Sequence, residues 1–324
     1  MGYLAATEHF ASQQAQALES GGAFQGDSEQ IRGDQLLAWR RGLLAAGGRA
    51  ADLDWLLDLG GGLSWQALQA LRLHPERAVT LKWRRQRLET LWRRHLHGAE
   101  PLQYLVGRCP WRDLELRVAP GVLIPRQETE QLVDLALALL PTQAASASPP
   151  LWADLGTGSG CLAIALGQAL PGSRGFAVEA SPQAERLARL NLAQAGMLGT
   201  VSLLAGDWWQ PLEPWRGHLN LVVSNPPYIP SATMAELDPV VRDHEPSQAL
   251  DGGVDGLTAI RAIVAGAEGA LAPGGLLVLE HHHDQSGFVL ELLQRAGLDQ
   301  VRAHRDLEGV CRFASALRRS DPLP

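Results

Sequence analysis

Residues 154–160 read Asp-Leu-Gly-Thr-Gly-Ser-Gly, and they stand where a predicted strand over residues 151–155 meets a predicted helix over residues 161–170. Glycines at such a junction let the backbone turn tightly and approach a ligand, and the first turn of the helix adds exposed amide groups. This stretch therefore predicts a nucleotide-like ligand at the turn. The predicted contact residues are Asp154, Gly156, Thr157, Gly158, Ser159 and Gly160.

Two neighbouring features indicate the nature of that ligand. Glu179 ends the next predicted strand, residues 175–179, where a carboxylate can accept hydrogen bonds from both hydroxyls of an unphosphorylated ribose. The glycine spacing is G-x-G-x-G, whereas a dinucleotide site has G-x-G-x-x-G, and Cys161 occupies the place of that last glycine. The pattern favours S-adenosylmethionine over NAD as the cofactor.

Residues after the third predicted strand, 200–204, complete the expected cofactor site. Asp207 stands where a carboxylate can meet an adenine amino group, and an indole of Trp208 or Trp209 can pack on the ring. For Trp209 a place in the core is an equal alternative. Asp154 either orders the glycine turn or accepts a hydrogen bond from the methionine ammonium, and it needs a donor because a buried unpaired acid is costly.

A second motif, Asn-Pro-Pro-Tyr at residues 225–228, follows the fourth predicted strand, residues 219–224. The side-chain oxygen of Asn225 and the backbone carbonyl of Pro226 offer two acceptors, one for each hydrogen of an NH2 group. The two prolines keep both acceptors in extended backbone, and the tyrosine can stack on a flat amide or base. The expected catalytic residues are Asn225, Pro226 and Tyr228, and the expected substrate-binding residues are Asn225, Pro226, Pro227 and Tyr228.

This second motif leaves the substrate open, because an NH2 group occurs both in a carboxamide and on a nucleic-acid base. A carboxamide nitrogen is a poor nucleophile, since its lone pair is delocalised into the carbonyl, so a catalyst has to hold it in place. The alternative is a nucleic-acid methyltransferase that acts on the amino group of adenine or guanine. In isolation the motif could also be a simple turn. A non-catalytic adaptor that binds the cofactor is disfavoured, because the reaction centre is intact.

The alternation of strands and helices from residue 125 onward predicts an α/β fold. Strands are predicted at residues 151–155, 175–179, 200–204, 219–224, 276–280, 301–304 and 310–317. Such alternation is typical of a parallel sheet covered on both faces, which binds ligands at the carboxyl ends of its strands. The last two strands are close enough for a hairpin, so one of them should be antiparallel. We expect the Rossmann-like fold of class I S-adenosylmethionine-dependent methyltransferases.

The earlier part of the chain divides differently. Residues 1–30 are rich in Gln, Ala, Gly and Ser and predict a mobile extension, whereas residues 31–99 repeat apolar residues at helical spacing and predict a small helical domain. Helix starts are expected at Ser64 and at His74 with Pro75. Residues 100–124 predict a hairpin connector to a methyltransferase domain over residues 125–324.

Charge and cysteine content narrow the choice of partners. A net charge of −7 disfavours a polyanion as the main partner, although residues 72–97 carry eight Lys and Arg against two Glu. That basic stretch is either a contact surface or a solvated helix face. Three cysteines, Cys109, Cys161 and Cys311, lack metal or redox spacing, and the chain shows neither a secretory signal nor an apolar membrane-length stretch. We expect a cytoplasmic monomer with no membrane partner and no direct binding of nucleic acid.

Several motifs together resemble the bacterial release factor glutamine methyltransferases, the PrmC or HemK family. The resemblance covers residues from about 34 to the end and is carried by more than the tetrapeptide at 225–228, which other amino-methylating enzymes share. The further blocks are Leu-Ile-Pro-Arg at 123–126, Glu-Thr-Glu at 128–130, His-Glu-Pro at 244–246, Ala-Leu-Asp-Gly-Gly at 249–253, Asp-Gly-Leu at 255–257, Leu-Glu-His at 279–281 and Arg-Asp-Leu at 305–307. The chain departs from the family in its N-terminal extension and at residues 109–111, where we expect an aromatic residue before the tryptophan.

The resemblance implies a specific reaction. It implies transfer of a methyl group from S-adenosylmethionine to the side-chain amide nitrogen of the Gln in the Gly-Gly-Gln motif of class 1 translation release factors. The helical N-terminal domain would help to dock that protein substrate. By position, residues 156–160, Glu179, Trp208 and Asn225 would contact the cofactor, and residues 225–228 the glutamine.

Two other groups of polar residues have simpler interpretations. Three consecutive histidines at 281–283 suggest a metal, but neighbouring residues at a strand end cannot all face one ion, so no metal site is expected. Arg126, Glu128 and Glu130 either form an ion pair that frames the site or cap the helix that follows. We favour the cap for Glu128, because acids suit the first turn of a helix.

Overall fold

A computed structural model of the protein describes residues 28–141 and 149–320. The described residues form two compact units, which divide between Arg108 and Cys109. The division falls inside residues 100–124, which the sequence predicts as a connector. Most of the predicted extension lies outside the described residues, but its end, Glu29 and Gln30, belongs to a strand. None of the described helices is long and apolar enough to cross a membrane.

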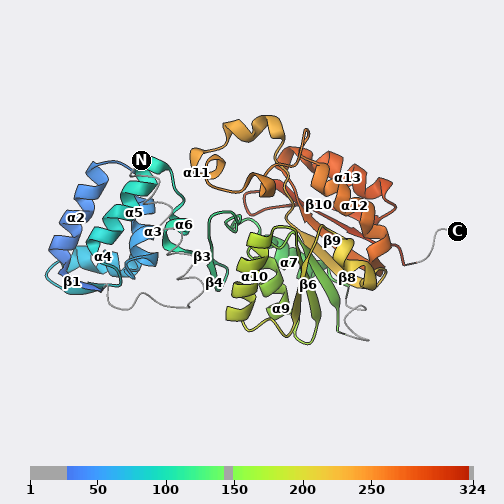
Figure 1. Ribbon diagram of the computed structural model, residues 1–324, viewed down its shortest axis with the longest axis horizontal. Coiled ribbons are helices and arrows are strands. Elements are labelled where there is room, and N and C mark those ends of the chain that lie inside the picture. Colours follow the sequence, from blue (N-terminus) through green and yellow to red (C-terminus); the bar gives the residue numbers. More distant parts are fainter. Residues whose placement is uncertain (1–27, 142–148, 321–324) are drawn as a thin grey trace. The chain divides into compact units, whose positions relative to one another are not determined.

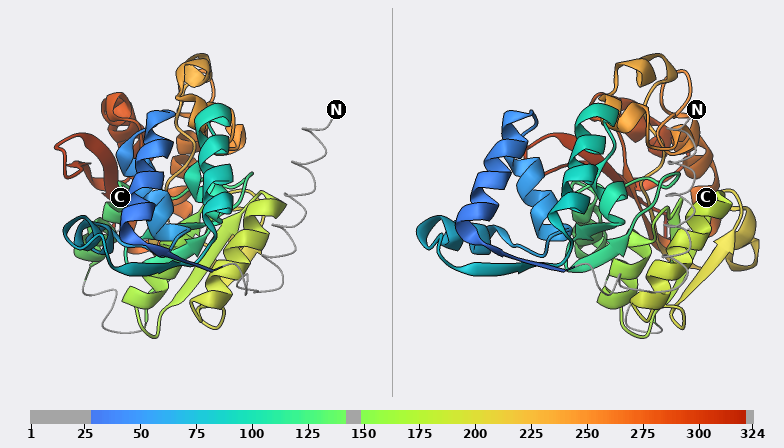
Figure 2. Two further views of the ribbon diagram at one scale, coloured as in Figure 1. Left: turned by 90° about the vertical axis from the view of Figure 1, so that its left-hand side faces the viewer. Right: turned by 60° about the vertical axis from the view of Figure 1, so that its left-hand side comes forward.

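The N-terminal unit is a group of helices with a strand pair at one end (Figure 2). Its helices are α2 (Gly33–Ala45), α3 (Ala50–Leu59), α4 (Trp65–Leu73), α5 (Arg85–Gly98) and α6 (Leu102–Val106), and its strands are β1 (Glu29–Arg32) and β2 (Ala78–Leu81). The apolar stripes of the helices meet in one core, in which Leu36, Leu53 and Leu56 are fully buried. This burial is the main source of the unit's stability, at about 1.5–3 kcal/mol for each leucine.

Two details of this unit test the sequence predictions. Ser64 is confirmed as a helix start, because its hydroxyl accepts a hydrogen bond from the backbone amide of Ala67 at 3.2 Å. The predicted start at His74 and Pro75 is wrong: His74 ends α4, and the next helix begins at Arg85. The intervening residues form β2 instead, which pairs antiparallel with β1. Its partner strand straddles the predicted boundary between the extension and the helical domain, so nothing local in the sequence indicates the pairing.

The C-terminal unit is built on a seven-stranded sheet (Figure 1). The strands are β5 (Leu151–Leu155), β6 (Arg174–Glu179), β7 (Val201–Ala205), β8 (Leu219–Ser224), β9 (Leu271–Glu280), β10 (Asp299–Arg305) and β11 (Cys311–Leu317). They lie in the order β10-β11-β9-β8-β5-β6-β7. Neighbours from β9 to β7 are parallel, whereas β11 is antiparallel to both β9 and β10. The predicted α/β class with one antiparallel strand from the last pair is confirmed.

Helices cover both faces of this sheet, as the alternation along its strands requires. They are α7 (Glu130–Leu139), α9 (Cys161–Ala169), α10 (Pro182–Gln194), α12 (Thr258–Ala270) and α13 (Ser286–Arg295). A strand pair, β3 (Arg108–Trp111) and β4 (Leu114–Arg117), precedes α7, and a short α11 (Pro239–Arg242) lies between β8 and α12 in the sequence. Leu277 and Leu279 of β9 join the core with α12 and α13, whereas Leu276 and Val278 join the core with α7 and α9. Both faces of the sheet are therefore largely apolar.

Candidate active site

A cavity of about 170 Å³ opens at the carboxyl ends of the central strands. It is the place where a doubly wound sheet binds its ligands. Seven of the residues predicted from the sequence line it: Gly156, Gly158, Glu179, Asp207, Trp208, Asn225 and Pro227. The structure therefore brings the glycine turn after β5, the acid at the end of β6 and the motif after β8 to one cavity.

The glycine turn is held mainly by backbone bonds. The amides of Gly156 and Thr157 both donate to the carbonyl of Val178 in β6, at 3.0 and 2.9 Å. Gly156 and Gly158 have φ of +73° and +57°, in the left-handed region that side chains disfavour. These residues must therefore be glycines for the turn to keep its shape beside the cavity.

Glu179 is the acid that closes this turn. One carboxylate oxygen accepts from the amide of Gly158 at 2.8 Å, and the other accepts from the amide of Ser181 at 2.8 Å. Each carboxylate oxygen can accept more than one hydrogen bond. Glu179 can therefore hold the turn in place and still accept from ligand hydroxyls in the cavity that it lines.

Three of the predicted cofactor residues support the turn from behind and do not line the cavity. Thr157 and Ser159 are buried, and the carbonyl of Ser159 accepts from the side-chain amide of Asn191 at 2.8 Å. Gly160 has φ of +85° and lies against Ala188, so it allows α9 to start close to α10. The sequence motif marked these residues correctly as part of the turn but could not separate supporting positions from lining ones.

Asp154 lies beneath the turn and is fully buried. One carboxylate oxygen accepts from the Thr157 hydroxyl at 2.6 Å, while the other has no hydrogen-bond partner among the described residues. Burial, with a smaller contribution from the Glu179 charge, raises the pKa of Asp154 to about 7. Asp154 thus orders the turn, which is the first of the two predicted roles.

The two neighbouring tryptophans have different places. Trp208 lines the cavity, and its ring would stand 3.3 Å from a Cβ placed on Gly156. Trp209 instead donates from its indole nitrogen to the carbonyl of Ile263 in α12 at 3.0 Å and packs against the core there. Of the two alternatives that the sequence leaves open for Trp209, the structure selects the core.

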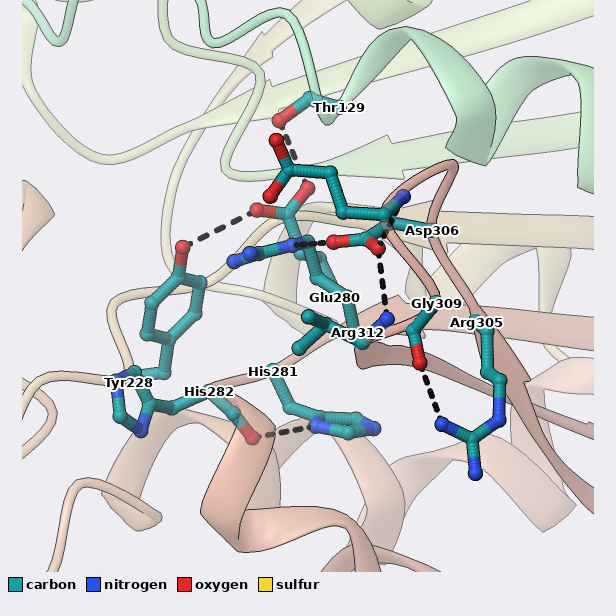
Figure 3. Close-up of polar contacts among 11 residues, drawn as sticks. Thr129, Tyr228, Glu280, His281, His282, Arg305, Asp306, Gly309 and Arg312 are labelled. Atoms are coloured by element: carbon teal, nitrogen blue, oxygen red, sulfur yellow. Dashed lines mark hydrogen bonds and ion pairs between the residues drawn. The ribbon is translucent and has the colours of Figure 1, made fainter.

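The Asn-Pro-Pro-Tyr segment leaves the sheet at the end of β8. Ser224 anchors it, because its buried hydroxyl donates to the carbonyl of Leu155 in β5 at 2.6 Å. Asn225 and Pro227 line the cavity, whereas Pro226 and Tyr228 are not among its lining residues. Tyr228 points toward β9, where its hydroxyl donates to Glu280 at 3.1 Å, and burial raises its pKa (Figure 3). The tyrosine therefore stays a protonated donor.

Two polar residues beside this segment do not appear among the predicted site residues. The Nδ2 of Asn225 donates to the hydroxyl of Thr129 at 2.9 Å. That hydroxyl donates to Glu280 at 2.7 Å (Figure 3). Glu280 is 1% exposed, and its burial raises its pKa to about 7. Both residues fall in blocks quoted for the family resemblance, Glu-Thr-Glu and Leu-Glu-His, which was the available signal.

Arg126 forms an ion pair that joins two of those blocks. Its Nη2 lies 2.7 Å from an oxygen of the buried Glu245, whose other oxygen accepts from the amide of Ile124 at 3.1 Å. The prediction that Glu128 lies in the first turn of the following helix is wrong, because α7 begins at Glu130 and the acid in its first turn is Glu130. The local sequence predicts the start of this helix to within two residues, but it does not show which of the acids lies in the first turn.

The histidines at 281–283 face different directions. His281 is buried, with Nδ1 2.8 Å from the carbonyl of His282, whereas the Nδ1 of His282 contacts Asp284 at 2.5 Å. Within residues 28–141 and 149–320, no group of three or more His, Cys, Asp or Glu side chains could hold a metal ion. Burial lowers the pKa of His281.

Comparison with known proteins assigns this arrangement to a family. Residues 129–238 match the family model of the methyltransferase small domain. The chain is 50% identical to the release factor glutamine methyltransferase of Prochlorococcus marinus over 88% of this chain and 97% of that protein. It is 44% identical to the protein of the same name from Gloeobacter violaceus, over 82% and 89% of the two chains.

The solved structures show a shared fold. The hMettl16 catalytic domain in complex with an RNA hairpin is 14% identical and superposes with a TM-score of 0.52, over 76% of this chain and 86% of that one. At this identity the likeness concerns the fold alone. The sequence relatives and their coverage are the stronger finding, and on them the chain belongs to the family of release factor glutamine methyltransferases.

Proposed function

We propose that this protein methylates the side-chain amide nitrogen of the glutamine in the Gly-Gly-Gln motif of class 1 translation release factors. It would then act as a protein-(glutamine-N5) methyltransferase with S-adenosylmethionine as methyl donor. The observation that carries the proposal is the position of Asn225, whose side chain lines the same cavity as the glycine turn and Glu179. Relatives that match nearly the whole chain bear the name of this activity.

The residues around the cavity fit S-adenosylmethionine. Glu179 can accept from ribose hydroxyls, Asp207 from an adenine amino group, and Trp208 can pack on the adenine ring. The unpaired oxygen of Asp154 is an acceptor and supports a role toward the methionine ammonium. When bound, the cofactor supplies an electrophilic methyl group on a sulfonium.

The chemistry then depends on how the amide nitrogen is held. The Asn225 side-chain oxygen and the Pro226 carbonyl would each accept one hydrogen of the substrate NH2 group. A single hydrogen bond contributes only about 1 kcal/mol net, whereas correct placement of two reacting groups contributes on the order of 7 to 11 kcal/mol. The rigid path of Pro226 and Pro227 therefore matters more than either hydrogen bond alone.

The N-terminal helical region, residues 31–99, is the proposed docking element for the release factor, with residues 100–124 as connector and 125–324 as the catalytic domain. The basic stretch of this region, residues 72–97, does not support a polyanion as partner. Arg85, Arg93 and Arg94, three of its eight basic residues, are in ion pairs with Glu29, Glu89 and Glu100, so part of the positive charge is neutralised locally. A monomer in the cytoplasm, where release factors meet ribosomes, is the simplest state for this reaction.

A transfer assay on the protein substrate tests this function. Purified class 1 release factor, this protein and S-adenosylmethionine should give one methyl group on the motif glutamine, located by peptide mass spectrometry. Release factor with that Gln replaced by Ala should take up none, and nucleic acids in its place should not be methylated. Cofactor binding without any transfer to release factor would contradict the substrate assignment, and methylation of adenine or guanine would favour the nucleic-acid alternative.

A further inference from the structure

Four side chains form one continuous chain of hydrogen bonds behind the Asn-Pro-Pro-Tyr segment. Asn225 donates to Thr129 at 2.9 Å. Thr129 donates to one oxygen of Glu280 at 2.7 Å, and Tyr228 donates to the other oxygen at 3.1 Å (Figure 3). Thr129 lies just before α7 and Glu280 ends β9, so three separate parts of the fold supply these groups. The first and last residues of the motif are thereby tied to one carboxylate.

The direction of each bond follows from what each group can donate. An ionised carboxylate only accepts, and a threonine hydroxyl has a single proton. Because Thr129 gives that proton to Glu280, its oxygen acts as an acceptor toward Asn225. Only the NH2 end of the asparagine amide can fill the matching donor role. The oxygen of Asn225 then points away from Thr129 and is available in the cavity that Asn225 lines.

We propose that Thr129 and Glu280 are positioning residues that fix the amide of Asn225 with its oxygen toward the substrate. The inference rests on the proposed function, in which the substrate group is an NH2 with two hydrogens to donate. An asparagine rotated by half a turn would present its own NH2 to that group, donor against donor. Because Glu280 only accepts, the Thr129 hydroxyl must donate to it and accept from Asn225, and this orients the amide of Asn225.

The charged and polar groups that face Glu280 come from every segment around it. Thr129 and Tyr228 donate to it, Arg312 of β11 favours its ionised form, and Glu128 disfavours it. Arg312 is itself held by Asp306 at 2.8 Å. Burial outweighs the favourable contacts and raises the pKa of Glu280 to about 7. Below that pH Glu280 gains a proton and becomes a donor, so the Thr129 hydroxyl is free to turn toward Asn225.

Variants at the two positioning residues test the inference by steady-state kinetics with release factor as substrate. Glu280→Gln is isosteric but can donate to Thr129, and Thr129→Val has no hydroxyl. Each should lower kcat about 10- to 100-fold, as small misplacements near a reaction centre do, with cofactor Kd changed by less than about two-fold. Thr129→Ser should restore most of the activity that Thr129→Val loses. The wild-type kcat should decrease as the pH is lowered below 7, and the kcat of Glu280→Gln should not show this decrease.

A double variant separates a shared pathway from two independent defects. If both residues act through the same hydroxyl, Thr129→Val with Glu280→Gln should be no slower than Thr129→Val alone, since their effects are then not additive. Ser173→Ala is the matched control. It removes a buried hydroxyl that accepts from Trp152 at 2.9 Å, at the amino end of β6. It should lower stability and leave kcat and the pH profile unchanged.

The outcomes distinguish this inference from the proposed function. If the wild type transfers no methyl group to release factor, the proposed function fails. If the wild type is active, and Glu280→Gln retains both the wild-type kcat and its decrease below pH 7, the positioning role is overturned. Additive losses in the double variant, or a Thr129→Ser as slow as Thr129→Val, would also overturn it. Bound cofactor in each variant reports that the fold around the cavity is intact.

Discussion

The glycine turn after β5 and the Asn-Pro-Pro-Tyr segment after β8 border one cavity but are held in different ways. The turn is fixed by backbone hydrogen bonds to β6 and by Glu179, which accepts from the amide of Gly158. These two residues are only 21 positions apart in the sequence. The second segment is fixed by side chains far away in sequence: Asn225 and Thr129 are 96 residues apart, and Tyr228 and Glu280 are 52 apart. Changes at the turn should therefore act on cofactor affinity, whereas changes at distant side chains should act on catalysis.

The largest effect is expected at Asn225. Asn225→Ala removes the acceptor that would hold the reacting nitrogen in place, so kcat should fall about 10²- to 10³-fold, because placement is lost together with the hydrogen bond. Although Asn225 is also expected to contact the cofactor, cofactor affinity should change much less than kcat, because the glycine turn, Glu179 and Trp208 remain. Isothermal titration of S-adenosylmethionine beside a methyl-transfer assay measures both quantities. If kcat and the affinity for the cofactor fell by the same factor, the distinction between the two regions would be contradicted.

A second effect concerns stability and pH. The folded-state pKa of Glu280 and that of Asp154 are raised from 4.5 and 3.8 to about 7, so the folded protein binds protons more tightly than the unfolded chain. Their contribution to stability is fully present below about pH 4 and is lost as the pH rises through about 7. Glu280→Gln lacks one of these groups. Between pH 5 and pH 8 its free energy of unfolding should therefore decrease by about 3 kcal/mol less than that of the wild type.

Urea unfolding without cofactor, at intervals between pH 5 and pH 8, measures that difference. Ser173→Ala serves again as the comparison, since it changes a buried hydroxyl and no titrating group. Parallel stability curves for wild type and Glu280→Gln would show that the carboxyl is not titrating in this range.

A smaller effect is expected where Arg126 supports the site wall. Arg126→Met leaves the buried carboxylate of Glu245 without its cation and should lower the free energy of unfolding by about 2 kcal/mol. Arg126 is about one-third exposed, which keeps the loss below that for a fully buried pair. Adding Glu245→Gln to Arg126→Met should recover part of the stability, and a thermal unfolding series that shows no recovery would contradict this explanation.

The smallest effect is expected at the glycine turn itself. Gly156→Ala places a Cβ at a φ of +73° and 3.3 Å from the Trp208 ring, which costs on the order of 1–2 kcal/mol. Cofactor Kd should rise about 10-fold while kcat at saturating cofactor stays near the wild-type value. Gly172→Ala, at φ of +79° in a turn with no atom near its Cβ, is the matched control for backbone strain alone. A fall in kcat with unchanged Kd would contradict the assignment of the turn to binding.

The same comparison explains what the sequence could predict. The glycine turn, Glu179 and strands β5 and β8 follow from neighbouring residues, and their predicted positions agree closely with the structure. The strand pair β1–β2 and the roles of Thr129 and Glu280 depend on partners that local patterns do not connect; Thr129 and Glu280 are 151 residues apart. The choice between core and cofactor for Trp209 likewise depends on its packing against α12, whose Ile263 is 54 residues away along the chain.

The hydrogen bond from Ser224 to Leu155 joins the ends of two adjacent strands. The glycine turn, proposed to bind the cofactor, leaves the sheet from one of these strands, and the Asn-Pro-Pro-Tyr segment, proposed to bind the substrate, leaves it from the other. Parallel neighbours lie about 4.8 Å apart. In the proposed reaction, the reach between methyl donor and methyl acceptor would therefore be set by the sheet's own spacing. Loops and docking elements around it can vary to admit a different partner without altering that reach.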